Sequence, residues 1–204
     1  MKRIKKFVDK LLDFTHGGYY AILSLIARII GDFLAFLYIP GYNIFDNMVS
    51  DLGVGDGWFF FSLGLILSGI ICIPFYISMA RSIHSDENNE KTKKIGLIFF
   101  YISDITYILI AFFPAIESNY LIFIAHGLLA IITWLTAITY LIIFSRLMEK
   151  DEKFSKLPAN SGYFLIIVMI IFLFTWLPII EWIMTFIFII WLLIISSYMI
   201  YHKL

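Results

Sequence analysis

Long apolar stretches alternate with short polar connections along the whole chain of 204 residues. A helix needs about 20 apolar residues to cross the hydrocarbon layer of a membrane. Six stretches reach this length, so the pattern predicts an all-α, polytopic six-helix transmembrane bundle formed by residues 18–204. The predicted spans are residues 18–39, 58–79, 96–115, 121–145, 162–180 and 182–201.

The segment before the first predicted span, residues 1–17, mixes lysines with apolar residues at helical spacing. Its apolar positions are Ile4, Phe7, Val8, Leu11, Leu12 and Phe14. This pattern predicts an amphipathic helix on the inner membrane surface. Each lysine there would favour anionic lipid by about 1 kcal/mol. The simpler alternative is that these charges only set the topology of the chain.

Lysine and arginine concentrate in the N-terminal segment and in the second and fourth connections between spans. The first, third and fifth connections contain neither, and their acidic residues are Asp46, Asp51, Asp56, Glu117 and Glu181. Connections rich in Lys and Arg stay on the cytoplasmic side. We therefore expect a multi-pass protein of the cell membrane with both termini in the cytoplasm and the acidic connections outside.

The composition agrees with this interpretation and excludes several classes of protein. Apolar residues make 61% of the chain, charged residues 15%, and the mean hydropathy is +0.92. A soluble domain is about half apolar and about a quarter charged, so a soluble enzyme and a disordered chain are excluded. The 15 basic and 15 acidic residues cancel, which leaves no field to attract nucleic acid. A single cysteine, Cys72, excludes a disulfide framework and a cysteine-ligated zinc site.

Three ionisable residues, Arg28, Asp32 and Asp104, lie inside predicted spans. A charge there costs at least about 2.5–3.5 kcal/mol, so each should face the bundle interior and find a partner. The helical rise of about 1.5 Å per residue places Arg28 level with Asp104, and Asp32 level with His126 nearer the outside. Two polar layers are therefore expected. Arg28 and Asp32 are also four residues apart on one helix, so they can pair directly.

Two interpretations of these charges are possible, a structural ion-pair network or a polar cavity open to the outer side. The candidate polar cluster consists of Arg28, Asp32, Ser50, Asp51, Asp104, Glu117, His126 and Glu181. His126 beside a carboxylate could act as a general base or as one metal ligand. Ser50 could be a nucleophile, although a serine before an aspartate in a turn is more often a helix cap. The familiar motifs of metalloproteases, serine hydrolases and P-loop enzymes are absent from the sequence, and we expect neither a cofactor nor a metal site.

Small residues mark two further features of the sequence. The first connection, residues 41–57, holds four glycines, two asparagines and three aspartates. Such residues form specific turns, so this connection should be ordered and is a candidate for function. In the second predicted span, Gly64, Ser68 and Gly69 should let a neighbouring helix approach closely.

Several short motifs occur in a characteristic order. Ser50-Asp51-Leu52-Gly53 follows the first span, an L-G-L-I-L-S-G pattern occupies residues 63–69, Phe113-Pro114 ends the third span, His126-Gly127 lies early in the fourth, and Glu181 begins the last hairpin. This order resembles the domain of unknown function 998 family of prokaryotic membrane proteins, which is similar in architecture to the DRAM and Sfk-type six-helix proteins. The resemblance covers the chain from about residue 20 and implies a six-helix bundle with a polar cluster of Asp51, His126 and Glu181.

Two functions follow from these observations. The first is an integral membrane protein that binds or organises lipid, or that is a subunit of a membrane complex. Its partners would be membrane lipids and other membrane subunits. The alternative is an intramembrane enzyme, or a carrier of a small solute or lipid, that uses an outward-facing cavity of Asp, His and Glu side chains.

Overall fold

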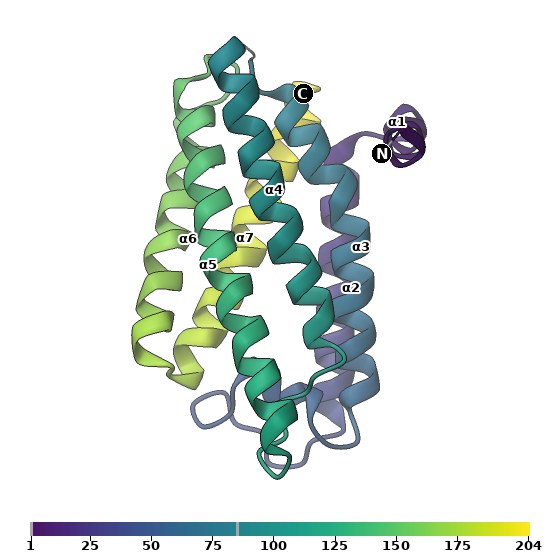
Figure 1. The fold of residues 1–204 in the computed structure, drawn as a ribbon, viewed down its shortest axis with the longest axis vertical. Helices are drawn as coiled ribbons and strands as arrows, with labels where there is room; N and C mark the ends of the chain where they lie inside the picture. Colours follow the sequence, from purple (N-terminus) through teal and green to yellow (C-terminus); the bar gives the residue numbers. More distant parts are fainter. Residues whose placement is uncertain (1, 85) are drawn as a thin grey trace.

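The fold is all-α in a computed structural model of the chain, which describes residues 2–84 and 86–204 (Figure 1). Within these residues the chain forms seven α-helices, one short 3-10 helix and no strand. The elements are α1 (Lys2–Phe14), α2 (Gly17–Leu37), η1 (Val49–Gly53), α3 (Trp58–Ser82), α4 (Glu87–Ile110), α5 (Tyr120–Lys150), α6 (Lys156–Thr175) and α7 (Pro178–His202).

Helices α2 to α7 form a closed ring. Each helix packs against its neighbours in the chain, and α7 packs against α2. The helices run up and down the long axis of the molecule, and both chain ends lie at one end of the bundle, opposite η1 (Figure 1). Because the ring is closed, each of these helices presents one face to a common interior.

Five of these helices, α2, α3, α5, α6 and α7, are long and apolar enough to cross a membrane. The last 18 residues of α4 still include Lys93, Lys94 and Asp104, and α4 is not among the five. Large apolar side chains are exposed along the outside of the bundle, for example Ile98, Leu128 and Phe174. Such a surface would be unstable in water and suits the hydrocarbon of a bilayer. The chain is therefore a multi-pass membrane protein.

Helix α4 differs from the third predicted span, residues 96–115. It begins at Glu87, because Asp86 caps its first turn by accepting a hydrogen bond from the Asn89 backbone N–H at 2.6 Å. It ends at Ile110, shortly before Pro114, which disfavours helical backbone in the residue ahead of it. The polar residues 87–94, which the predicted spans leave in the second connection, thus form the first turns of a helix.

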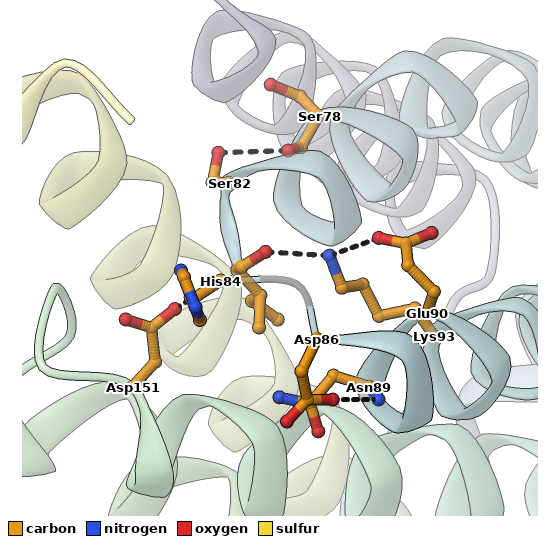
Figure 2. Close-up of polar contacts among 9 residues, drawn as sticks. Ser78, Ser82, His84, Asp86, Asn89, Glu90, Lys93 and Asp151 are labelled. Atoms are coloured by element: carbon orange, nitrogen blue, oxygen red, sulfur yellow. Dashed lines mark hydrogen bonds and ion pairs between the residues drawn. The ribbon is translucent and has the colours of Figure 1, made fainter.

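The two connections at the end of the bundle near the chain termini are fixed by buried polar groups (Figure 2). Asp151 follows α5 and His84 follows α3. The Asp151 carboxylate accepts a hydrogen bond from the His84 backbone N–H at 2.5 Å. The buried Lys93 ammonium donates to the Ile83 carbonyl at 2.7 Å and pairs with Glu90 at 2.9 Å. These contacts join the α3–α4 and α5–α6 connections, so this end of the ring is held together by more than its helices.

Helices α2 and α3 approach most closely where small residues meet. A Cβ atom placed on Gly31 would lie 2.7 Å from the Gly64 Cα atom and 2.8 Å from the Phe60 carbonyl oxygen. Along the same interface, the Ser24 hydroxyl donates to the Ser68 carbonyl at 2.8 Å. The predicted close approach at Gly64 is confirmed. At Gly69 the close neighbours are side chains of α4, Ile108 and Asp104.

Helix α1 confirms that the N-terminal segment is helical. It stands away from the ring at the end that holds both chain termini (Figure 1). Asp9 pairs with Arg81 of α3 at 2.6 Å, and the Tyr20 hydroxyl donates to the Leu11 carbonyl at 2.9 Å. The side chains of Ile4 and Phe7, which belong to the predicted apolar face, lie outside the described part of the structure. A role of α1 on the membrane surface stays a prediction.

The α2–α3 contact predicts that Gly31→Ala is destabilising. The added methyl group meets backbone atoms of α3, so the helices must separate, and overpacking of this kind costs about 1–3 kcal/mol. The melting temperature of the purified protein should fall by about 2–4 °C per kcal/mol. Gly127→Ala is the matched control, because a Cβ atom there meets nothing within 4 Å. Equal melting temperatures for the two variants would contradict the close contact.

Candidate functional site

A cavity of about 150 Å³ lies inside the ring, and residues of α2 to α7 and of η1 all line it. Apolar and aromatic side chains make most of its wall. Apart from the Tyr and Trp side chains, the polar side chains in the wall are Ser24, Arg28, Ser50, Ser68, Ser103, Asp104, His126, Thr133, Glu181 and Thr185. Of the eight residues predicted from the sequence, five line this cavity, namely Arg28, Ser50, Asp104, His126 and Glu181.

Several hydroxyl groups at the cavity are already hydrogen-bonded to the protein. The Ser103 hydroxyl donates to the Thr133 carbonyl at 3.0 Å, and the Thr133 hydroxyl donates to Thr106 at 2.8 Å. The hydroxyls of Ser68 and Tyr107 lie 3.1 Å apart. These pairs join α4 to α5 and α3 to α4, so their first role is to satisfy polar groups between helices.

Arg28 pairs along its own helix. Its Nε atom lies 2.8 Å from Asp32 Oδ2, which confirms the direct pairing predicted from their spacing. The guanidinium lies over the Phe61 ring, 4.6 Å from its centroid, and 5.8 Å from that of Tyr107. The buried Nη1 atom of Arg28 has no hydrogen-bond partner among the described residues. The predicted midplane pair between Arg28 and Asp104 is wrong, because Asp32 on the adjacent helical turn is the nearer acid.

Asp104 lines the cavity from α4 and is buried, with 8% of its surface exposed. Its Oδ1 atom lies over Gly69 of α3, 3.1 Å from the position that a Cβ atom would take there. Among the residues that the structure describes, none donates a hydrogen bond to this carboxyl group or forms an ion pair with it. Asp104 therefore presents a polar group to the cavity without a protein partner.

Glu181 ties the first connection to the start of α7. Its Oε2 atom accepts a hydrogen bond from the Val49 backbone N–H at 2.7 Å, and the Ser50 backbone N–H also faces the carboxyl group. The neighbouring Trp182 indole donates to the Tyr42 hydroxyl and to the Asn47 carbonyl, both at 3.2 Å. The side chains of two consecutive residues thus hold the connection across the end of the ring.

The first connection is ordered, as its composition predicted. Asp51 Oδ2 accepts a hydrogen bond from the Met48 backbone N–H at 2.8 Å and so caps η1. The Tyr42 hydroxyl donates to the Met48 carbonyl at 2.5 Å. Burial raises the pKa of Tyr42, so this hydroxyl keeps its proton and remains a donor. Asp51, rather than Ser50, is the capping residue, and Asp51 itself does not line the cavity.

His126 joins α5 to the turn that follows α4. Its Nδ1 atom lies 2.8 Å from the Phe113 carbonyl oxygen, so two of the sequence motifs contact each other here. The predicted layer of Asp32 with His126 does not form, because Asp32 pairs with Arg28. Asp51 is the acid that acts electrostatically on His126. Within the described residues, no three His, Cys, Asp or Glu side chains are placed to hold a metal ion.

Glu117 lies away from the site. It is exposed in the connection between α4 and α5 and does not line the cavity. The acidic connections of the sequence are therefore unequal in role. Glu181 and Asp51 make specific contacts with η1, whereas Glu117 is free to face solvent.

The aromatic side chains that line the cavity together with Asp104 were not among the site residues predicted from the sequence. Phe100, Asp104 and Tyr107 occur at positions i, i+4 and i+7 of α4 and so share one helix face. Tyr76 of α3 and Tyr140 of α5 complete this group from the neighbouring helices. An aspartate on an aromatic helix face was the available signal, but the same spacing is common in helices that only pack.

The contact of Glu181 with η1 yields a prediction for Glu181→Ala. Hydrogen bonds to charged groups are worth about 1.5–3 kcal/mol, so their loss should loosen the first connection. Hydrogen exchange of the Val49 and Ser50 amides should become at least tenfold faster, while amides in the middle of α5 stay unchanged. Glu117→Ala is the control and should leave exchange in residues 43–54 as in the wild type. No change in Glu181→Ala would mean that another contact fixes η1.

Comparison with known proteins gives a family match over most of the chain. No curated protein and no solved structure matches the chain. A family model described as a protein of unknown function, DUF998, matches residues 22–198. This range includes all the sequence motifs and all the polar residues that line the cavity. The chain belongs to the DUF998 family of proteins of unknown function.

Proposed function

We propose that this protein is a membrane-embedded binding protein that carries a small molecule in the cavity inside its helix ring. The observation that carries the proposal is the cavity itself, which six helices surround and ionisable groups line. The buried Arg28 Nη1 atom has no hydrogen-bond partner among the described residues, and Asp104, which lines the cavity, forms no hydrogen bond or ion pair within that part of the chain. Polar groups buried in a membrane are costly unless they are satisfied, and a bound molecule would satisfy them.

The volume limits the kind of ligand. Pockets for drug-sized molecules measure about 300–1,000 Å³, and this cavity measures about 150 Å³. An apolar cavity of about 150 Å³ in another protein holds one benzene molecule. A whole phospholipid is far larger than this. The size therefore favours a small solute over the lipid-binding function that the sequence also suggested, and lipids would contact the outer surface of the ring.

The arrangement of His126 favours binding over catalysis. The Ser-His-Asp type of base needs a carboxylate on the histidine Nδ1 atom, but the His126 Nδ1 atom faces the Phe113 carbonyl. Glu181 is likewise engaged by backbone N–H groups of η1. Two of the predicted catalytic groups thus hold the ends of helices and connections in place, which is what a binding protein requires of them.

The proposed membrane arrangement has six spans, α2 to α7, with both chain termini in the cytoplasm of the cell. The asymmetry of Lys and Arg between the connections supports it, as does the position of both chain ends at one end of the bundle (Figure 1). In this arrangement η1 lies on the outer side. Helix α1, with its exposed Lys6 and Lys10, lies at the cytoplasmic surface, where anionic lipids would attract it.

Cysteine labelling in intact cells tests the orientation. Asp56→Cys and Lys150→Cys place thiols at exposed positions at opposite ends of the bundle, and the native Cys72 is buried. A membrane-impermeant maleimide should label Asp56→Cys in intact cells and Lys150→Cys only after lysis. Unmodified protein is the control for Cys72. The reverse pattern would invert the topology, and labelling of both in intact cells would contradict the odd number of spans, α3, α4 and α5, proposed between them.

Small probes of equal length test the cavity. We expect at least one of n-butylammonium, 1-butanol and butyrate to raise the melting temperature of the protein in lipid nanodiscs. Ala130→Phe should abolish this shift, because Ala130 lines the cavity and the added ring fills it. Leu128→Phe, on the exposed surface of the same helix, is the control and should keep the shift. A shift that persists in Ala130→Phe, or its absence with all three probes, would refute binding in the cavity.

A further inference from the structure

We propose that the cavity binds a small organic cation, an amine or a quaternary ammonium, held by the Asp104 carboxylate and by the rings of Tyr76, Phe100 and Tyr140. This inference rests on the proposed binding function and names the class of its ligand. It follows from the distribution of unpaired charge around the cavity and from the kind of side chain that surrounds Asp104.

The charges that line the cavity are not equally available to a ligand. Arg28 is neutralised by Asp32 at 2.8 Å, and its guanidinium lies over the Phe61 ring. Glu181 is bound to the Val49 backbone N–H at 2.7 Å. Asp104 has no such partner among the described residues, although it is buried, with only 8% of its surface exposed. The cavity therefore contains one acid that the protein does not compensate, and the missing partner is a cation.

Three aromatic rings from three helices pack against one another in the wall of the cavity. Tyr76 and Phe100 are stacked with centroids 3.9 Å apart. Tyr140 meets both rings edge-on, at 5.3 Å from Tyr76 and 5.8 Å from Phe100. All three line the cavity that Asp104 also lines. Phe100 precedes Asp104 by one helical turn, so the ring and the carboxyl group lie on the same face of α4.

Aromatic rings and a carboxylate together favour a cation over other ligands. The faces of the rings are negative, so they attract an ammonium group, and the attraction grows when the site excludes water. The Tyr76 and Tyr140 hydroxyls lie 3.0 Å apart and bond to each other, which leaves the carboxylate to bind the charge directly. An anion would instead meet Asp104 and Glu181. The cavity of about 150 Å³ limits the cation to a few carbon atoms.

The test compares the three butyl probes, whose charges are +1, 0 and −1, by isothermal titration of the protein in nanodiscs. We expect n-butylammonium to bind at least tenfold more tightly than 1-butanol, and butyrate to bind more weakly than both. Asp104→Asn keeps the shape of the side chain and removes its charge, so it should erase the preference for the cation and leave 1-butanol unchanged. Asp56→Asn, in the exposed part of the first connection, is the matched control and should keep the preference.

Two further variants address the geometry of the site and serve if Asp104→Asn does not fold. Phe100→Leu removes one ring and should weaken the binding of n-butylammonium several-fold relative to that of 1-butanol. Phe123 is exposed, and Phe123→Leu should leave both affinities unchanged. Gly69→Ala places a methyl group 3.1 Å from Asp104 Oδ1 and should weaken the binding of n-butylammonium in the same way. Gly127→Ala is its control.

The outcomes separate this inference from the function on which it rests. Equal affinity for n-butylammonium and 1-butanol, with both lost in Ala130→Phe, would overturn the cation site and leave a binding cavity. Preference for butyrate would also overturn the cation site and would indicate that the Arg28 Nη1 atom binds an anion. Binding that no cavity variant affects would overturn both proposals. A cation preference that depends on Asp104 and Phe100 would support both.

Discussion

The packing of α7 against α2 is the contact on which the rest of the structure depends. Without it the six helices would form an open sheet of hairpins, and the polar groups on their inner faces would meet lipid. With it the ring is closed, and those groups face a protected interior. In a membrane, where water is not available to satisfy polar groups, closure is the condition for placing Arg28, Asp104 and Glu181 inside the protein.

The ring is fixed differently at its two ends. At the end with the chain termini, the α3–α4 and α5–α6 connections are joined through His84, Asp151 and Lys93 (Figure 2). At the other end, Glu181 and Trp182 of α7 hold η1 and the connection before it. Residues 50–53, Phe113-Pro114, His126-Gly127 and Glu181, four of the five sequence motifs, lie toward this second end. The contacts of Asp51 and Glu181 fix η1 across this end of the ring.

The polar residues in the spans separate into two groups once their partners are known. Arg28 with Asp32 and His126 with Phe113 satisfy each other within the protein, and such pairs set the register of helices. Asp104 has no partner of this kind among the described residues and lines the cavity together with Tyr76, Phe100 and Tyr140. The same chemical feature, a charge in a span, is thus structural in one place and a candidate for ligand binding in another.

The sequence by itself determined the helical class, the multi-pass membrane character and the approximate position of the five candidate spans, because apolar length acts locally along the chain. It also identified the charged residues that required an explanation. Only the tertiary structure decided their partners, since depth along a helix does not fix the rotation of that helix. The helical rise predicts Arg28 level with Asp104, but Arg28 pairs with Asp32, a neighbour one turn away on the same helix. The side chains of Tyr76, Phe100 and Tyr140 come from α3, α4 and α5, and only the packing of these helices brings their rings into contact.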